Sequence, residues 1–476
     1  MSESPVAFTG MRGGFRLFSA PVPRAAQVNR GLAEAWAGEN DAGQVSDSHH
    51  AAPAVARARS GGGAAGGRKP GSLRPLRIVT FTTLFPNAAQ PTHGVFVSNR
   101  LRHLVASGCV SARVIAAVPW FPRLLGRWLR GYESFAQVPD EERHGEIPVR
   151  HPRFPVIPKV GMTLAPFLLA AWTFGAVRRL QGAGGFDLID AHYFFPDGVA
   201  ATMIGRLLRK PVVITARGTD VNLIPKYALP RRLILWAAGA AAGIITVSEA
   251  LKDELVALGV APSRIRVLRN GVDLDMFRPK DRAAARAALG LDGPTLVSVG
   301  WLIERKGHDL IIEALAQLPG YRLLLVGQGP ERAALERLAA RLGVGDRVRF
   351  LGRIAHERLA DIYAAADALV LASSREGWPN VLLEAMACGT PVVASNIWGN
   401  PEVVARPEAG VLMLERSAMG VAEGVRMLFR ALPDRAATRR YAEMFSWDDT
   451  TRGQIELFTE VLGLCGRAAW GEQHVP

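Results

Sequence analysis

Cysteine is scarce in this sequence, which has three among its 476 residues: Cys109, Cys388 and Cys465. Their wide spacing fits neither a framework of disulfides nor the ligand spacing of a metal site. Few and scattered cysteines are typical of proteins kept in a reducing compartment. We therefore expect no disulfides, no metal site built on cysteine and a cytoplasmic location.

Long hydrophobic runs are also missing. No stretch of 18 or more uninterrupted apolar residues occurs, which disfavours an integral membrane protein. The nearest approach is 162–177, MTLAPFLLAAWTFGAV, which is too short and contains Pro166, so it predicts a buried or interfacial helix. No continuous apolar core follows the first charged residues either, and we expect no secretory signal.

Acidic residues are outnumbered by basic ones, 43 to 57, which gives a net charge of +14. Such an excess concerns partners and solubility, and it points to nucleic acid, an anionic membrane surface or a pyrophosphate. The basic residues are scattered among apolar helical segments, and the sequence has no RNA- or DNA-binding signature. We therefore expect an anionic lipid surface or a pyrophosphate as partner, and no nucleic acid.

Periodicity is weak in the first 72 residues, which contain Gly-Gly-Gly-Ala-Ala-Gly-Gly and several Ala-Arg pairs. This composition predicts a disordered extension, although a start codon assigned too far upstream would give the same pattern. Residues 465–476 are interpreted as a tail.

From residue 76 onward, short β-rich runs alternate with helical segments. In the first half, strands are expected at 76–81, 114–118, 187–192, 211–215, 244–248 and 265–268. In the second half they are expected at 295–299, 322–326, 348–350, 368–371 and 391–394. Helices are expected at 95–106, 199–209, 249–258 and 380–388, with a last one from 448 to about 464. This alternation predicts two doubly wound parallel sheets that face each other across a cleft.

The most informative stretch is 375–391. Pro379 suits the first turn of a helix and Gly389 its end. Trp378 has no side-chain oxygen that could cap this helix, so its first amides are left for a ligand or for water. An anion is the natural partner of three of them: Asn380, Val381 and Leu382.

Two glutamates in this stretch, Glu376 and Glu384, lie eight positions apart in EGWPNVLLEAMACGTPVVAS. A bare pair at this spacing is more often two solvated residues on a Leu-rich core helix. Here the loop, the helix stop and the following strand all resemble the Glu-x7-Glu motif of retaining glycosyltransferases with the GT-B fold, family 4 in particular. The resemblance implies that Glu384 binds the donor ribose and that Glu376 lies near the transferred sugar.

A second motif, GWLIERKG at 300–307, resembles the family's G-R-L-x-x-x-K-G. Lys306 matches the lysine that neutralises the donor diphosphate, whereas Trp301 occupies the place of a common arginine. Arg305 is therefore expected to supply the second cation. The same resemblance implies that Gly94 lies near the donor phosphate. It also implies that Arg353 and Ile354, at the end of a strand, contact the nucleotide base.

Two loops that follow strands, HYFFPDG at 192–198 and RGTD at 217–220, resemble segments of family members that build surface polysaccharides. Open α/β sheets bind ligands at such strand ends. The acceptor-side residues implied are His192, Arg217 and Asp220, although a lone histidine beside aromatics is more often structural. Many members carry histidine in place of Arg217. An arginine there suits a phosphate or an acceptor carboxylate.

The segment 119–130, PWFPRLLGRWLR, places arginines at helical spacing beside Trp120, Phe121 and Trp128. This pattern is typical of a basic amphipathic segment at a membrane surface. A surface helix whose apolar side packs on its own domain explains it equally well.

Together these observations predict an α/β protein of the GT-B fold. Its domains are a disordered extension (1–72), an acceptor domain (73–273), a donor domain (274–447) and a helix, 448–464, that returns to the first domain. The predicted activity is that of a retaining, hexosyltransferase-type enzyme without a metal or organic cofactor.

This enzyme would transfer a sugar from a nucleoside diphosphate to a lipid-linked saccharide in exopolysaccharide or cell-envelope synthesis. We expect it on the inner face of the cytoplasmic membrane, with Glu376, Lys306 and Arg305 acting in catalysis. The alternatives are a nucleotide-sugar epimerase of the same architecture and a non-catalytic scaffold that binds anionic lipid.

Overall fold

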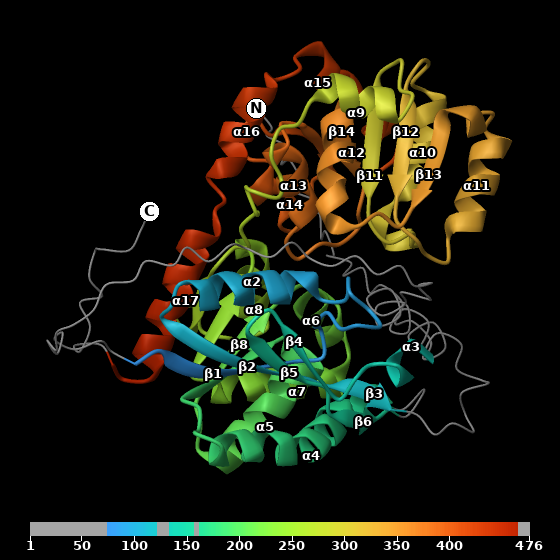
Figure 1. Ribbon diagram of the computed structural model, residues 1–476. Helices are drawn as coiled ribbons and strands as arrows, with labels where there is room; N and C mark the ends of the chain where they lie inside the picture. Colours follow the sequence, from blue (N-terminus) through green and yellow to red (C-terminus); the bar gives the residue numbers. More distant parts are fainter. Residues whose placement is uncertain (1–73, 121–132, 157–160, 465–476) are drawn as a thin grey trace, which may run out of the picture.

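The structure, a computed structural model, describes residues 74–120, 133–156 and 161–464, which form two α/β domains (Figure 1). The predictions for 1–72, for most of the basic amphipathic segment and for the tail fall outside the described residues. In the part of the chain described, no helix is long and apolar enough to cross a membrane.

The N-terminal sheet has eight strands in the order β10-β9-β8-β7-β1-β2-β5-β4. All neighbours pair in parallel except β4 and β5. The strands are β1 (Leu76–Thr82), β2 (Val110–Ala116), β4 (Glu141–His144), β5 (Ile147–Arg150), β7 (Leu188–His192), β8 (Val212–Ala216), β9 (Gly243–Thr246) and β10 (Ile265–Val267). Residues of β7, β8 and β9 are buried throughout, as expected for a parallel sheet covered by helices on both faces.

The C-terminal sheet has six parallel strands in the order β13-β12-β11-β14-β15-β16. The strands are β11 (Thr295–Val299), β12 (Arg322–Val326), β13 (Val348–Gly352), β14 (Ala368–Leu371), β15 (Val392–Ser395) and β16 (Gly410–Met413). The strand order reverses between β11 and β14, and such a switch point creates a crevice at the carboxyl ends of the strands. The predicted fold class, two doubly wound parallel-sheet domains, is confirmed.

Helices cover both faces of each sheet. Those of the first domain are α2 (Val95–Ala106), α3 (Glu133–Ala136), α4 (Gly161–Gly182), α5 (Val199–Leu208), α6 (Thr219–Asn222), α7 (Ala228–Ala240) and α8 (Glu249–Ala257). Those of the second are α9 (Arg282–Ala288), α10 (His308–Ala316), α11 (Arg332–Arg341), α12 (Leu359–Ala365), α13 (Asn380–Ala387), α14 (Asn400–Val403), α15 (Ala418–Arg430) and α16 (Arg435–Glu443).

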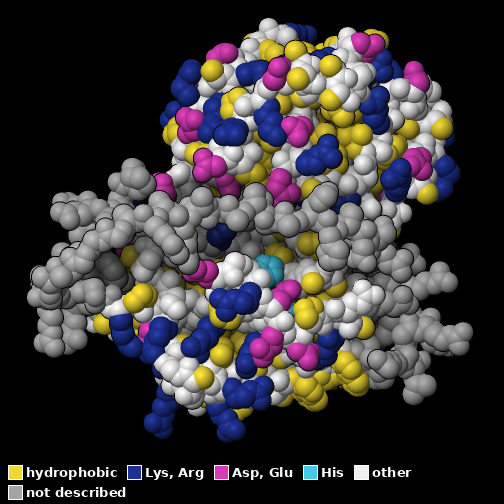
Figure 2. Space-filling view, viewed as in Figure 1, with side chains coloured by type: hydrophobic (Ala, Val, Ile, Leu, Met, Phe, Trp, Pro, Cys, Tyr) yellow, Lys and Arg dark blue, Asp and Glu magenta, His cyan; other side chains and the backbone are white. Residues whose placement is uncertain are grey.

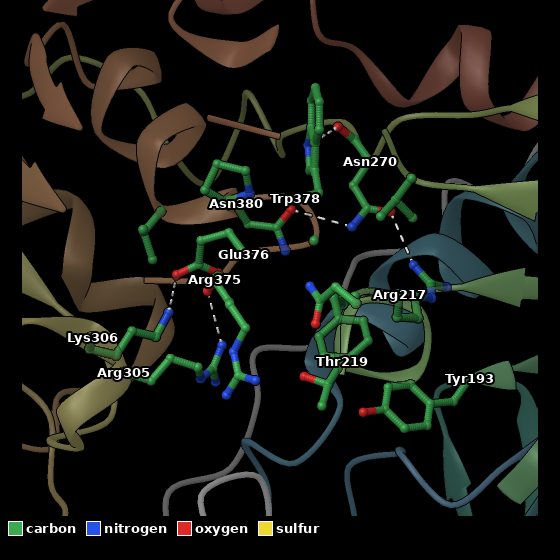
Figure 3. A pocket seen from close by; sticks show the side chains of 17 residues that line it. Tyr193, Arg217, Thr219, Asn270, Arg305, Lys306, Arg375, Glu376, Trp378 and Asn380 are labelled. Atoms are coloured by element: carbon green, nitrogen blue, oxygen red, sulfur yellow. Dashed lines mark hydrogen bonds and ion pairs between the residues drawn. The ribbon is translucent and has the colours of Figure 1, made fainter. Parts of the chain in front are cut away.

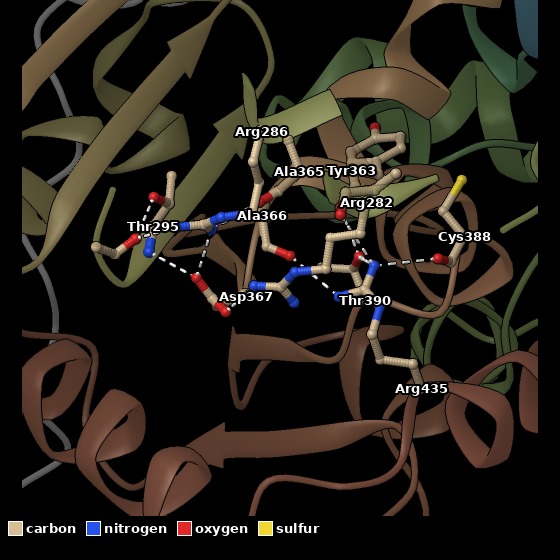
Figure 4. A network of polar contacts seen from close by, with 12 residues as sticks. Arg282, Arg286, Thr295, Tyr363, Ala365, Ala366, Asp367, Cys388, Thr390 and Arg435 are labelled. Atoms are coloured by element: carbon tan, nitrogen blue, oxygen red, sulfur yellow. Dashed lines mark hydrogen bonds and ion pairs between the residues drawn. The ribbon is translucent and has the colours of Figure 1, made fainter. Parts of the chain in front are cut away.

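A polar network anchors α13, the helix of the Glu-x7-Glu stretch, inside the C-terminal domain (Figure 4). The Arg435 guanidinium donates to Thr390 Oγ1 at 2.7 Å and to the carbonyl oxygen of Cys388 at 3.3 Å, directly behind the end of α13. On the other side of the network, Asp367 accepts hydrogen bonds from the amide of Thr295 and pairs with Arg286. The helix that carries Glu384 is therefore held at its C-terminal end by Arg435 of α16.

The last helix, α17 (Trp447–Val461), packs beside α2 of the N-terminal domain (Figure 1). Arg100 of α2, which is 1% exposed, donates through Nε to Gln454 Oε1 of α17 at 2.8 Å. The helix ends three residues before the predicted Leu464, because Gly463 adopts a left-handed conformation with φ 67° and turns the chain away.

Both predicted boundaries of one strand in the first domain are wrong. The strand expected at 114–118 begins four residues earlier, at Val110, and ends at Ala116. Val118 instead starts β3 (Val118–Trp120), which pairs with β6 (Arg153–Pro155) in a separate small sheet. One continuous apolar run thus supplies strands to two sheets, which a pattern of hydrophobicity does not reveal.

Candidate active site

A pocket lies between the two domains, at the carboxyl ends of both sheets (Figure 3). We call it the first pocket. Its N-terminal wall consists of Phe96, Tyr193, Arg217, Gly218, Thr219, Asn222, Val247 and Asn270. Its C-terminal wall consists of Arg305, Lys306, Arg375, Glu376, Gly377, Trp378, Pro379, Asn380 and Val381.

A second pocket adjoins the first and shares Phe96, Asn380 and Val381 with it. It is more apolar in character, and the C-terminal domain provides most of its wall. Among its lining residues are Gly300, Trp301, Arg353, Ile354, His356 and Glu384. The two pockets therefore place both glutamates of the Glu-x7-Glu stretch along one cleft.

Lys306 and Glu376 form an ion pair in the first pocket, with Lys306 Nζ 2.7 Å from Glu376 Oε1. Burial alone would raise the pKa of the Glu376 carboxyl, but the charges of Lys306 and Arg305 outweigh it and hold that pKa below its ordinary value. The lysine loop is held there by Gly307, where φ is 68° and a Cβ would overlap the carbonyl oxygen of Ala372. Glycine at this position lets the lysine reach across to Glu376.

The amides at the start of α13 are less available than the sequence predicted. Pro379 adopts φ −85° and ψ 80°, so it is the N-cap and not the first helical residue. The resulting tight turn uses the Asn380 amide, which donates to the Trp378 carbonyl at 3.1 Å, and the Leu382 amide, which donates to the Pro379 carbonyl at 3.0 Å. Leu382 is fully buried, so the expectation of a free amide is wrong for Asn380 and Leu382 and remains a prediction for Val381.

Glu384 lies in the second pocket with its carboxylate already oriented. Oε2 accepts a hydrogen bond from the Tyr363 hydroxyl at 3.0 Å, and Oε1 lies 3.1 Å from His356 Nε2. Burial lowers the pKa of His356, but the hydrogen bond and charge of Glu384 outweigh burial and raise it above the ordinary imidazole value. Each carboxylate oxygen retains lone pairs, so the group can still accept bonds from a diol.

Behind the first pocket, Arg217 belongs to a buried polar network. Its guanidinium donates through Nη2 to His192 Nδ1 at 2.6 Å and through Nη1 to Asn270 Oδ1 at 3.2 Å. His192 Nε2 in turn lies 3.1 Å from Asp190 Oδ2, so the neutral imidazole donates to this carboxylate. Burial lowers the pKa of His192 and reduces that of Arg217 to about 9.

This network extends to both the C-terminal helix and the donor-side loop. Gln454 Nε2 donates to Asp190 Oδ2 at 3.1 Å, and Asn270 Nδ2 donates to Asn380 Oδ1 at 3.3 Å. Trp378 Nε1 donates to the Asn270 carbonyl at 3.0 Å. Buried side chains thus connect α17, the acceptor-side loops and the start of α13.

Besides the buried Leu382, three residues predicted from the sequence lie outside the walls of both pockets. His192 is 1% exposed and supports Arg217 from behind. Asp220 is fully buried, where its carboxylate accepts the amides of Phe194 at 2.6 Å and Gly218 at 2.7 Å. At Gly94, a Cβ would lie 2.7 Å from the amide nitrogen of Phe85. Glycine is therefore needed here because its backbone packs directly against the backbone of Phe85.

Several residues at the site were not predicted as functional. Arg375 and Tyr193 line the first pocket, and His356 and Tyr363 orient Glu384. The sequence offers no signal for the last two, because their partner is more than twenty positions away. Asp273, which begins an Asp-x-Asp sequence, binds Arg102 at 3.0 Å and caps the amide of Met276 at 2.9 Å. Among the described residues, no cluster of His, Cys, Asp and Glu could hold a metal ion.

Comparison with protein families gives two matches that together span most of the described chain. Residues 127–276 match the model described as Glycosyltransferase Family 4. Residues 280–444 match the model described as Glycosyl transferases group 1.

Curated relatives include D-inositol 3-phosphate glycosyltransferases. The protein of Mycobacteroides abscessus is 36% identical over 307 residues, which is 60% of this chain and 69% of the relative. That of Saccharomonospora viridis is 33% identical over 334 residues, which is 62% of this chain and 76% of the relative.

Solved structures share the fold at lower identity. Sucrose-phosphate synthase from Thermosynechococcus elongatus superposes with a TM-score of 0.66 and 22% identity, covering 82% of this chain and 100% of the other. HepE of Anabaena in complex with UDP and glucose superposes with a TM-score of 0.62 and 21% identity, covering 81% of this chain and 100% of the other. With these two domain matches and with relatives above 30% identity, the chain belongs to the family 4 glycosyltransferases of the GT-B fold.

Proposed function

We propose that the protein is a hexosyltransferase that moves a sugar from a nucleoside diphosphate to an acceptor hydroxyl, with retention at the anomeric carbon. The observation that carries the proposal is the part-buried Lys306–Glu376 ion pair, which lies in the same cleft as an oriented Glu384. Structures of this fold have been solved with UDP and with UDP-glucose, which supports a nucleotide-sugar donor.

The donor would extend across both pockets. Glu384 would accept two hydrogen bonds from the ribose, and Arg353 and Ile354 would meet the base in the second pocket. Lys306 and Arg305 would neutralise the diphosphate, and Glu376 would contact the sugar in the first pocket. Cationic side chains placed in this way stabilise the negative charge that develops on the leaving diphosphate in the transition state, which is the main contribution of such a site to catalysis.

Retention is what the resemblance to the family implies, and the charges of the site are compatible with it. Among the described residues that line the first pocket, Glu376 is the one carboxylate, and Lys306 holds it in an ion pair. We infer that it does not attack the sugar. The bond from the anomeric carbon to the diphosphate breaks, the acceptor oxygen bonds to the same face, and its proton passes to the leaving phosphate.

The acceptor is proposed to be a lipid-linked saccharide in exopolysaccharide or cell-envelope synthesis, with the enzyme attached to the inner face of the cytoplasmic membrane. Helix α4 supports such attachment, because its apolar residues Leu164, Phe167 and Trp172 are 40–54% exposed. Figure 2 shows apolar and basic side chains together along the lower edge of the first domain, where α4 and α5 lie. The named activity of the relatives indicates a phosphorylated inositol as the second candidate acceptor.

The proposal is tested by two measurements in sequence. UDP, GDP and ADP are first added to the protein, and the one that is the leaving group should raise the melting temperature by mass action. The corresponding nucleotide sugars are then incubated with candidate acceptors, and the products are separated. A new glycoside supports transfer, whereas an epimerised donor would indicate the epimerase. If none of the three nucleotides raises the melting temperature, the proposed function is wrong.

A further inference from the structure

Positive charge exceeds negative charge in the first pocket. Its described lining residues include four cationic side chains, Arg217, Arg305, Lys306 and Arg375, and one carboxylate, Glu376. Lys306 is paired with Glu376, and Arg217 is bound to His192 and Asn270. Among the residues that the structure describes, no carboxylate lies within ion-pair distance of the other two.

Arg305 and Arg375 are held together by the backbone of their two loops. The amide of Ser374 donates to the Arg305 carbonyl at 2.8 Å, and Arg305 Nη1 donates to the Arg375 carbonyl at 3.3 Å. Figure 3 shows their guanidinium groups side by side, facing Thr219 across the cleft. Because both loops are anchored to the lysine motif and to Glu376, the two cations are fixed at the reacting end of the site.

Two neighbouring guanidinium groups repel each other unless an anion lies between them. Burial, and then the charge of Arg305, lower the pKa of Arg375, which reflects the cost of a second positive charge at this place. A guanidinium offers a planar set of donors that matches phosphate and carboxylate oxygens, so an oxyanion relieves this cost better than water does.

The opposite wall belongs to the N-terminal domain. Thr219 and Tyr193 line the pocket there, and Tyr193 adopts an unusual backbone conformation with φ 82° and ψ 125°. Strained conformations of this kind concentrate at functional sites, where the rest of the fold holds a side chain in place. Because Arg305 and Arg375 line the same pocket as these two residues, the cation pair faces the acceptor domain.

We propose that Arg375, which lies beside the diphosphate cation Arg305, binds an anionic group that is additional to the donor diphosphate. The group is a phosphate or a carboxylate, carried either by the acceptor or by the transferred sugar. This inference rests on the proposed glycosyl transfer, and it assigns to Arg375 a role in choosing the substrate. A neutral sugar passed to a neutral acceptor would leave Arg375 without an anionic partner.

The experiment compares matched pairs of ligands after the nucleotide has been identified as above. For the acceptor, D-inositol 3-phosphate and unphosphorylated inositol are titrated into protein saturated with that nucleoside diphosphate. For the donor sugar, the uronate and the neutral form of the same nucleotide sugar are titrated alone. In one of the two arms, the anionic ligand should bind at least tenfold more tightly than the neutral one.

Arg375→Ala should bring the ratio of the affinities for the anionic and the neutral ligand close to one. Arg375→Lys should restore part of this ratio. The matched control is Arg341→Ala, which removes an exposed cation from α11 and should leave the ratio unchanged. The proposal is overturned if neither arm discriminates in the wild type, or if Arg375→Ala leaves the ratio intact. It is also overturned if Arg375→Ala weakens the binding of the nucleoside diphosphate alone by the same factor, because Arg375 would then bind the diphosphate. Absence of all nucleotide binding would instead refute the proposed function.

Discussion

The backbones of Gly218 and Gly377 touch across the cleft: a Cβ on Gly218 would lie 3.1 Å from the Cα of Gly377. One glycine follows β8 in the first domain, and the other precedes α13 in the second. A Cβ on Gly377 would overlap the carbonyl oxygen of Arg217. The two loops that carry Arg217 and Glu376 therefore meet without any side chain between them.

Gly377→Ala should accordingly hold the cleft open. The added methyl group meets backbone on the opposite domain, so neither loop can relieve the overlap by a rotamer change. Since misplacement of reacting groups by about 1 Å can cost on the order of 100-fold, we expect a decrease in kcat/KM of roughly 10- to 100-fold. The radius of gyration, measured by small-angle scattering with the nucleotide bound, should increase.

Gly239→Ala is the control for this variant, because nothing lies within 4 Å of a Cβ at Gly239 in α7. It should preserve both kcat/KM and the radius of gyration. Wild-type turnover in Gly377→Ala would show that the domains do not need this contact.

Lys306→Ala should weaken both donor binding and turnover, because the diphosphate loses a cation. A loss of roughly 2 to 4 kcal/mol in transition-state stabilisation is expected, measured as the decrease in kcat/KM. The variant should also melt at a lower temperature, since the buried Glu376 carboxylate loses the partner that lies 2.7 Å away. Lys252→Ala, which breaks the surface pair with Glu249, is the control. Turnover equal to that of the wild type would show that Lys306 does not act on the donor.

Glu376→Gln and Glu384→Gln should have different kinetic effects. Glu384 lies in the second pocket and is expected to bind the ribose, so its change should mainly raise the KM of the donor. Glu376 lies beside Lys306, near the reacting sugar, so its change should mainly lower kcat. Steady-state kinetics with varied donor concentration separates these effects, and the same pattern in both variants would contradict the division of roles.

The His356–Glu384 pair should make stability depend on pH. The carboxylates that act on His356 are Glu384, Glu357 and Asp273, and the pKa of the imidazole is raised in the folded protein. A raised histidine pKa stabilises the fold fully below the unfolded value of about 6.5, and this contribution is lost as the pH rises through the folded pKa. The free energy of unfolding, measured from pH 5.5 to 8.5, should therefore show a wild-type advantage over His356→Gln that shrinks with rising pH. A constant difference would indicate that the pair does not titrate in this range.

Attachment to membranes should depend on the exposed face of α4. Phe167→Ser with Trp172→Ser should reduce sedimentation with anionic vesicles, because two side chains that are 45% and 54% exposed are lost. The control is Leu414→Ser in the second domain, where the leucine is 82% exposed. A second variant, with Arg123, Arg127 and Arg130 changed to Glu, tests the basic segment separately at low and high salt. Failure of the wild type to sediment would favour an acceptor that is not membrane-bound.

Much of the fold could be predicted because the βα alternation is regular. The bounds of β11, β12 and β14 agree with the predicted strands, since each is a short apolar run between turn residues. The bounds of α2 also agree, because Gly94 marks its start. The small β3–β6 sheet was missed, because its two strands come from distant segments and no local pattern records their pairing.

For the site, the sequence identified residues that carry a motif and missed those that act through distant contacts. Lys306 and Glu376 were both expected, yet their ion pair depends on a separation of 70 positions. Arg375 was overlooked although it precedes Glu376, because only the fold brings it into one pocket with Arg305 and Tyr193. The availability of the α13 amides was overestimated, because it depends on the dihedral angles of Pro379 and not on residue type.

Gln454, near the end of the chain, completes a buried polar network whose other members are synthesised much earlier. Arg100 and Asp190 are made early on the ribosome, yet both are buried against Gln454 of α17, which is among the last parts of the chain to emerge. Until then, the first domain has two buried charges without one of their polar partners, and leaving such groups unsatisfied is costly. The nascent protein therefore acquires the final arrangement around Arg217 only once its last helix has docked, so a chain interrupted before α17 should remain inactive even with both sheets complete.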